Sequence, residues 1–126
     1  MPELPEVESV ARALQNLVAG RKIERAELHR PRLAPHTTPA SFARHLRGAT
    51  INFVQRRGKH ILVDLTGNRT LIVHLRMSGR FMLLTAEMPD PKFAHAVFNL
   101  EDGDRLVFDD QRHFGLMKIV NTPELF

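Results

Sequence analysis

The spacing of the apolar residues changes along this chain, and this change limits the possible folds more than any other feature. Between residues 4 and 18, apolar side chains recur every three or four positions, which places them on one face of an α-helix. After residue 49 they fall into short β-rich runs separated by turn residues. These runs cover residues 51–57, 61–65, 70–76, 80–84, 94–100, 105–109 and 116–120. The pattern predicts a long helix followed by many strands.

Residues at the ends of the helical segments indicate where the helices begin and end. Pro5 suits the first turn of the first helix, where its missing N–H would have no partner, and Gly20 is a plausible stop. Thr38 followed by Pro39 predicts a second, short helix, because threonine is a good N-cap and proline fits the position after it. Gly48 is its expected end.

The segments between the strands favour antiparallel pairing. Residues 66–68 (Thr-Gly-Asn) and 101–104 (Glu-Asp-Gly-Asp) have the composition of hairpin turns, and residues 29–37 that of a loop. Two helices beside several antiparallel strands belong to the α+β class. We predict an antiparallel β-sandwich flanked by the N-terminal helix and the second short helix. One domain is expected over residues 1–120, with the start of an interdomain linker over residues 121–126.

Composition and charge narrow the function only slightly. The 126 residues carry a formal net charge of +4, which is compatible with binding a polyanion and equally with simple solubility. No apolar run approaches the ~20 residues that cross a membrane, and the N-terminus does not have the pattern of a signal peptide. Without cysteine the chain can form neither a disulfide nor a thiolate metal site, which fits the cytosol.

The N-terminus, Met-Pro-Glu-Leu-Pro-Glu-Val-Glu, carries the most informative chemistry. Removal of Met1 would leave Pro2 as a secondary amine, which is a nucleophile when unprotonated. An adduct with a sugar carbon would be an iminium, a good electron sink, and the adjacent Glu3 could supply a proton. Proline and glutamate are also ordinary helix-start residues, and local physics alone favours that structural interpretation.

Four blocks of sequence together resemble the N-terminal catalytic domain of formamidopyrimidine-DNA glycosylases. They are the N-terminal octapeptide, residues 57–59 (Arg-Gly-Lys), residues 74–79 (His-Leu-Arg-Met-Ser-Gly) and residues 110–115 (Asp-Gln-Arg-His-Phe-Gly). The blocks stand in the family's order and span essentially the whole chain. The resemblance implies base-excision repair of oxidised purines, such as 8-oxoguanine and formamidopyrimidines, by a DNA glycosylase that is also an abasic-site lyase.

The resemblance also implies a role for each matching residue. Pro2 would attack the sugar C1′ and form the Schiff base, Glu3 would protonate the sugar oxygen, and Glu6 would help to hold the site. Lys59, which we place with the catalytic residues, and His74 would contact phosphates around the flipped nucleotide.

A second group of residues would contact the DNA where the damaged base leaves the stack. Met77, Arg112 and Phe114 resemble the family's void-filling trio, with Arg112 facing the orphaned base and Phe114 wedging a base step. His95 is added as a DNA-binding candidate. Taken singly, each candidate residue could have a purely structural role. Lys59 would then be a solvated turn residue, and the others would be core, loop-anchoring or surface residues.

The chain departs from the family pattern at three places. Arg76 stands where a glycine is common, and Gln111 and His113 replace the proline and second arginine of the usual Asp-Pro-Arg-Arg-Phe-Gly. Residues 92–95 are Lys-Phe-Ala-His where the family often has Lys-His-Asp-His. The last change puts in doubt any role of the missing histidine and aspartate, although His95 remains.

The family's helix–two-turn–helix module and four-cysteine zinc finger follow this domain and are absent from this chain. We therefore expect no cofactor here, because the family's single zinc ion belongs to the C-terminal region. We also expect the domain alone to bind DNA weakly and to have little activity. The expected partner is double-stranded DNA with an oxidised base or abasic site, bound by a monomer in the bacterial cytoplasm, at the nucleoid, without a membrane. Two alternatives stay open: a non-catalytic DNA-binding fragment, and an endonuclease VIII-like glycosylase for oxidised pyrimidines.

Overall fold

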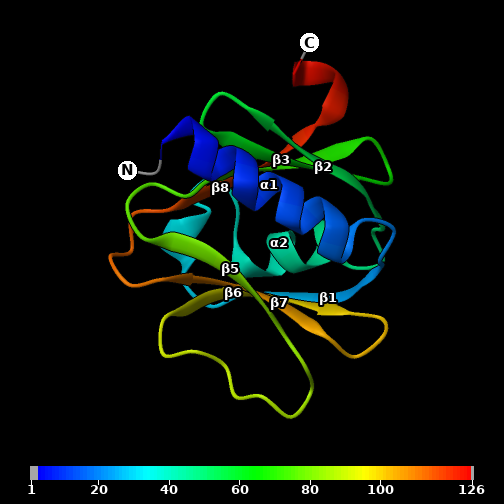
Figure 1. Ribbon diagram of the computed structural model, residues 1–126. Coiled ribbons are helices and arrows are strands. Elements are labelled where there is room, and N and C mark those ends of the chain that lie inside the picture. Colours follow the sequence, from blue (N-terminus) through cyan, green and yellow to red (C-terminus); the bar gives the residue numbers. More distant parts are fainter. Residues whose placement is uncertain (1–2, 126) are drawn as a thin grey trace.

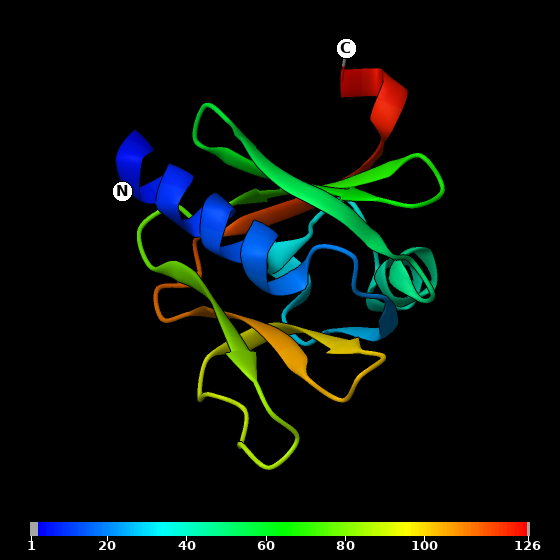
Figure 2. The same ribbon diagram turned by 45° about the vertical axis from the view of Figure 1, so that its right-hand side comes forward.

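The chain folds as two antiparallel sheets that face each other, with a helix along their open side (Figures 1 and 2). The computed structural model describes residues 3–125, and within them eight strands form two four-stranded sheets. One sheet has the order β1 (Ile23–Leu28), β6 (Ala94–Leu100), β7 (Arg105–Asp110), β5 (Gly79–Leu84). The other has the order β2 (Ile51–Arg57), β3 (His60–Leu65), β4 (Arg69–His74), β8 (Leu116–Asn121). The predicted α+β sandwich is confirmed.

Helix α1 (Leu4–Val18) is fastened to the edge strand β2. Its buried face consists of Val7, Ala11, Leu14 and Val18, as the spacing predicts. On its flank, the Gln15 side-chain oxygen accepts a hydrogen bond from the backbone N–H of Val54 at 2.7 Å. Arg56 also donates from Nε to Glu8 at 2.9 Å. These bonds to β2 fix the direction of the helix and therefore the place of its N-terminal end.

Helix α2 (Pro39–Leu46) begins and ends at the residues that the sequence indicates. The Thr38 hydroxyl oxygen accepts a hydrogen bond from the Ser41 N–H at 3.1 Å, which makes Thr38 the N-cap. Past its end, Gly48 adopts φ +80°, a conformation that favours glycine. Phe42 is fully buried, and its ring lies 6.0 Å from that of Phe98 in β6. The helix thus covers the β1 end of its sheet.

Strand β1 was missed because a bulge hides its alternation. The apolar pattern predicts strands only after residue 49. The register of β1 with β6 shifts between Ile23 and Arg25, so the strand buries Ile23, Ala26 and Leu28 with uneven spacing. Because the buried residues of β1 are irregularly spaced and separated by charged residues, the sequence lacks the alternation of apolar and polar residues that indicates a strand.

Strand β4 is shorter than predicted and ends at His74, two residues before the expected end at Arg76. Arg76 has φ +55°, which is incompatible with a strand and turns the chain toward β5. The remaining predicted strands are confirmed, two of them at their predicted bounds (β2 and β6) and the others within a residue or so.

The described C-terminal residues continue from β8 into a short helix. Asn121 is the last residue of β8, and residues Thr122–Leu125 form a 3-10 helix, η2. The Thr122 N–H donates to the Asn68 carbonyl at 2.7 Å, and its hydroxyl lies 2.9 Å from that of Thr70. The interdomain linker expected over residues 121–126, and the domain bounds that go with it, stay predictions.

Four segments that are far apart in the sequence meet at one end of the sandwich. The N-terminal end of α1, the β2–β3 turn, the β4–β5 loop and the β7–β8 loop all lie toward the left in both views (Figures 1 and 2). The predicted site residues come from these segments, apart from His95 in β6. Across residues 3–125, no helix is long and apolar enough to cross a membrane.

Candidate DNA-binding and catalytic site

The first turn of α1 presents two carboxylates at the N-terminal end of the molecule. The Glu3 carbonyl accepts hydrogen bonds from the N–H groups of Glu6 and Val7, both at 3.0 Å, and caps the helix through its backbone. The Glu3 side chain makes no capping hydrogen bond in the described chain, and both Glu3 and Glu6 are exposed. Pro2 lies outside the described residues, so only its covalent neighbour Glu3 can be located.

The β2–β3 turn presents Lys59. Gly58 occupies the turn with φ +57°, and its carbonyl accepts a hydrogen bond from Arg56 at 3.0 Å. Arg56 thus links this turn to α1 through its ion pair with Glu8. Lys59 follows the glycine and is half-buried. A lysine on a turn held in this way can act as a point charge toward a phosphate.

His74 ends β4 opposite a second histidine. His60 of β3 is its register partner, and the two rings meet edge to face with centroids 5.1 Å apart. The Arg76 N–H donates to His74 Nδ1 at 3.1 Å, so this nitrogen is unprotonated and Nε2 carries the hydrogen of the neutral ring. Burial lowers the pKa of His74, as do the charges of His60, Arg76 and Lys59. His74 is therefore a neutral hydrogen-bond donor at pH 7.

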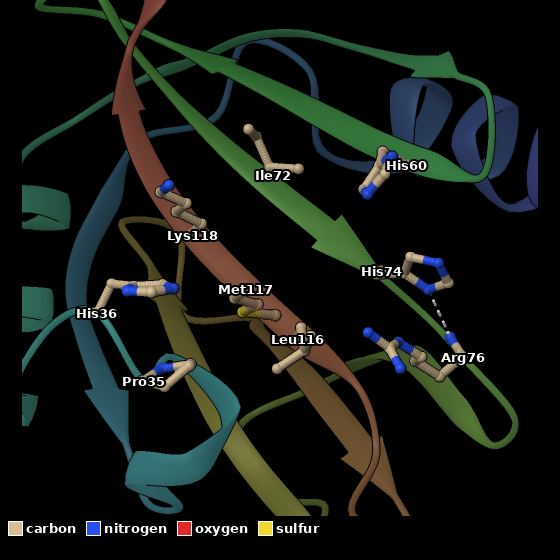
Figure 3. Close-up of a pocket in the computed structure, with 9 residues that line it drawn as sticks. All are labelled: Pro35, His36, His60, Ile72, His74, Arg76, Leu116, Met117 and Lys118. Atoms are coloured by element: carbon tan, nitrogen blue, oxygen red, sulfur yellow. Dashed lines mark hydrogen bonds between the residues drawn. The ribbon is translucent and has the colours of Figure 1, made fainter.

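A pocket of about 260 Å³ opens beside His74 on the face of β3, β4 and β8 (Figure 3). Every ionisable side chain that lines it is basic. They are His36, His60, His74, Arg76 and Lys118. His36 comes from the loop before α2 and Lys118 from β8, opposite the strand end with His74 and Arg76 (Figure 3). The charges of Arg76 and Lys118, beside histidine side chains and without a carboxylate in the lining, suit an anion such as a phosphate.

The β4–β5 and β7–β8 loops present large side chains to solvent. Met77 is 50% exposed and Phe114 52% exposed, although residues of this kind are usually buried. Arg112, in the same loop as Phe114, is also exposed. The structure thus places the predicted Met77, Arg112 and Phe114 on two adjacent loops at the end where α1 begins (Figure 2).

A hydrogen-bond network joins these two loops. Asp110 is fully buried, and its carboxylate accepts from the Ser78 hydroxyl at 2.5 Å and from the Gly115 N–H at 2.6 Å. The Ser78 oxygen in turn accepts from the Arg112 N–H at 2.9 Å. One carboxylate and one hydroxyl therefore fix the loop of Met77 against the loop of Arg112. Sequence reasoning assigned these residues no role.

Two glycines allow the loops to pack closely on Phe108 of β7. A Cβ at Gly79 would lie 2.6 Å from the Phe108 ring and from the Leu75 carbonyl oxygen. A Cβ at Gly115 would lie 2.8 Å from the same ring and from the Asp110 carboxylate. Both positions require glycine for lack of space, and the glycines of the two sequence blocks are the signal that could have revealed this packing.

His95 lies apart from the other candidates. It is 3% exposed in β6, beneath the β7–β8 loop, where its ring stacks on that of His113. Burial is the main cause that lowers its pKa, opposed by Asp110. A direct contact between His95 and DNA stays a prediction, and this burial does not favour it.

Similar solved structures define the class of protein. The fold matches that of the Lactococcus lactis Fpg in a complex with abasic-site DNA, with a TM-score of 0.92 and 34% identity. The match covers 98% of this chain and 46% of that one. A complex of Lactococcus lactis Fpg (MutM) with Fapy-dG-containing DNA matches with a TM-score of 0.91 over the same shares. The fold is therefore that of a bacterial DNA glycosylase domain.

Sequence comparison identifies the family. Residues 1–117 match the formamidopyrimidine-DNA glycosylase N-terminal domain. The formamidopyrimidine-DNA glycosylase of Symbiobacterium thermophilum is 50% identical over 115 residues, which are 91% of this chain and 37% of that protein. The enzyme of Streptococcus thermophilus is 43% identical over 98% of this chain and 45% of its own length. The chain belongs to the formamidopyrimidine-DNA glycosylase family, and it spans less than half the length of these relatives.

Proposed function

We propose that this chain supplies the catalytic half of a base-excision repair enzyme that removes oxidised purines and then cuts the strand at the abasic site. The observation that carries the proposal is the meeting of three features at one end of the sandwich. These are the carboxylates at the start of α1, the basic pocket beside His74, and the exposed side chains of the β4–β5 and β7–β8 loops. DNA with a damaged base is the expected partner.

The two loops supply the groups that would hold the duplex open. Flipping a nucleotide costs a few kcal/mol of stacking and pairing, and inserted side chains offset part of this cost. Met77 and Phe114 offer apolar surface for that purpose, and Arg112 offers a guanidinium to the orphaned base. Because their backbones are tied together by Ser78 and Asp110, they would enter the DNA as one unit.

The basic pocket and Lys59 would hold the phosphates that flank the flipped nucleotide. Lys59 would contribute a formal positive charge toward a phosphate. Neutral His74 would donate a hydrogen bond from Nε2 to a phosphate oxygen, which avoids the cost of burying another charged side chain. This arrangement would fix the sugar relative to the first turn of α1.

The chemistry would then proceed on Pro2 with Glu3 as the acid. The free proline nitrogen attacks C1′ and the base departs with its bonding electrons and a proton. Cleavage of the C1′–O4′ bond, with a proton passing from Glu3 to O4′, gives the iminium. Loss of a C2′ proton expels the 3′ phosphate, and a second elimination expels the 5′ phosphate. The iminium nitrogen accepts the electrons in the first elimination.

Borohydride trapping tests this proposal. The chain freed of Met1 is incubated with a duplex that contains an abasic site, reduced, and read by intact mass and peptide mapping. We expect one covalent adduct on Pro2. The matched control retains Met1, so its Pro2 nitrogen is an amide and no adduct should form there. Because the domain alone is expected to bind DNA weakly, protein and duplex are used at saturating concentrations. An adduct spread over lysines, or none at all with a free Pro2, would then contradict the catalytic proposal and favour a DNA-binding role without chemistry.

A second experiment tests which type of damaged base the protein prefers. Matched duplexes with 8-oxoguanine or an oxidised pyrimidine are given in excess to the same protein, and trapped adducts are compared. We expect the purine lesion to give more adduct. A clear preference for the pyrimidine would instead support the endonuclease VIII-like alternative.

This chain lacks the cysteine ligands expected for the family's zinc ion. The chain contains no cysteine, so it cannot supply the four thiolates of the zinc finger. Zinc is thus proposed only for a C-terminal region, and no step above depends on it.

A further inference from the structure

The two departures of this chain from the family pattern at residues 92–95 and 110–115 contact each other. His113, in the second block, stacks on His95, in the first, with ring centroids 4.8 Å apart and an angle of 9° between the planes. Nδ1 of His113 lies 2.9 Å from Nε2 of His95, a hydrogen-bond distance. The ring of Phe93 lies edge-on to that of His113 at 5.8 Å. The substituted Phe93 and His113 therefore pack together with the retained His95 in one cluster.

His113 is the residue between the two side chains that are proposed to enter DNA. Its backbone has φ +63°, and its side chain is half-buried while Arg112 and Phe114 on either side are exposed. Positive φ is uncommon for a residue other than glycine and marks a turn here. With the His113 side chain packed into the protein, its two neighbours face outward.

His95 is a firm anchor for this contact. It is buried in β6, and its carbonyl accepts hydrogen bonds from the N–H groups of His29 and Arg30 at 2.8 and 3.1 Å. Next to it, the Phe93 carbonyl accepts from the Asp110 N–H at 3.1 Å, which ties the same segment to the start of the loop. The loop is thus held from beneath by the His95 ring and from the side by Asp110.

We propose that His95 and His113 are positioning residues that hold the Arg112–Phe114 loop in its DNA-inserting conformation as long as no more than one of the two rings is protonated. The inference rests on the proposed function, since it assigns that loop to DNA. With both rings neutral, or with one protonated, one N–H donates to one lone pair across the 2.9 Å contact. With both protonated, two N–H groups face each other and the bond is lost.

The surroundings of His95 indicate in which pH range the contact is lost. His95 is buried, and this lowers its pKa, as do the charges of His113 and Arg30. Asp110 and Asp109 from β7 act in the opposite direction. Phe93 adds no charge, although the Lys92 ammonium lies 5.4 Å from the centre of its ring. Because burial lowers the pKa of His95, the doubly protonated state that breaks the contact is expected only below the ordinary histidine pKa of about 6.5.

Amide hydrogen exchange of the free protein tests the positioning role. His113→Asn keeps a polar atom near the place of Nδ1, tolerates positive φ and does not titrate. His113→Gly tolerates the backbone but removes the contact. We expect protection of the Arg112 and Gly115 amides to fall about fivefold in the wild type between pH 7.5 and pH 5, corresponding to ~1 kcal/mol for one hydrogen bond. Protection in His113→Asn should stay level, and protection in His113→Gly should be low throughout.

Two further readouts separate this inference from the proposed function. Ring ¹⁵N shifts should show that the loss of protection follows protonation of the second ring of the pair. Affinity for a duplex with a tetrahydrofuran abasic analogue, relative to His113→Asn, should fall about fivefold over the same pH range. Equal protection in the wild type and in both variants would overturn the positioning role, whatever the trapping experiment gives. Failed trapping with the exchange pattern as expected would overturn the catalytic proposal and leave the positioning of the loop intact.

Discussion

Arg76, two residues after the end of β4 at His74, has a backbone conformation that an L-residue rarely adopts. Its φ of +55° is one of three positive values among the non-glycine residues of the described chain, with Asn68 and His113. The left-handed region costs an L-residue ~1–2 kcal/mol, which explains why a glycine is common at this position in the family. The charge of Arg76 lies beside the basic pocket and helps to lower the pKa of His74.

Replacing Arg76 by glycine should therefore stabilise the domain. We expect Arg76→Gly to raise the free energy of unfolding by about 0.5–1 kcal/mol. The variant removes the backbone strain at this position, and the greater flexibility of glycine in the unfolded chain cancels part of that gain. Urea unfolding measures this change. Gln111→Gly is the matched control, because Gln111 is an exposed loop residue without positive φ and should lose stability. Equal losses in both variants would show that the Arg76 backbone is not strained.

The sequence predicts the roles of some individual residues and not those of others. Thr38 and Gly48 mark the ends of α2 because capping is local chemistry between residues three or four apart. The burial of His95 and its contact with His113 could not be predicted, because they depend on strand pairing across 18 residues. The catalytic assignment of Pro2 rests on the family resemblance and lies outside the described residues.

At the scale of elements, two loops act as one because a buried carboxylate joins them. Ser78 belongs to the β4–β5 loop and Asp110 ends β7, yet they are connected at 2.5 Å. This link does not follow from either sequence block alone. Strand β1 was likewise hidden by its bulge, whereas strands with regular alternation were found.

Removing the Ser78 hydroxyl should loosen this connection. Ser78→Ala deprives the buried Asp110 of one donor and the Arg112 N–H of its acceptor, so we expect a loss of about 2 kcal/mol in the free energy of unfolding. Hydrogen exchange should also speed up at Arg112. Ser9→Ala is the control, since Ser9 is exposed and bonds only to the Pro5 carbonyl of its own helix, and a change within ~0.5 kcal/mol is expected. A similar small change for Ser78→Ala would refute the structural role of the network.

At the scale of the whole molecule, the sandwich brings together segments that the sequence keeps apart. The hairpins follow from local turns, but the pairing of β1 with β6, β4 with β8 and β5 with β7 is long-range. No local pattern specifies such pairs, so the sequence predicted the class of fold without its strand order. Those long-range pairs place the β4–β5 and β7–β8 loops beside the start of α1.

The molecule also offers an alternative polyanion surface, which makes the proposed one testable. Three arginines, Arg25, Arg44 and Arg47, and one acidic residue, Glu24, line a hollow between β1 and α2, toward the opposite end from the proposed site. A basic surface of this kind would bind DNA without selecting a lesion. The proposed site differs by combining basic groups with the exposed Met77 and Phe114.

The most direct measurement is a map of backbone amide shifts of the ¹⁵N-labelled chain during titration with a duplex that carries a tetrahydrofuran abasic analogue. An undamaged duplex of the same sequence serves as the comparison. We predict that lesion-dependent changes concentrate in the first turn of α1, the β2–β3 turn, and the loops of Met77 and Arg112. Residues 66–68 and the surface of Arg25, Arg44 and Arg47 should change little between the two duplexes. Largest changes on that arginine surface, or equal changes with both duplexes, would contradict the assignment of this end of the sandwich to lesion recognition.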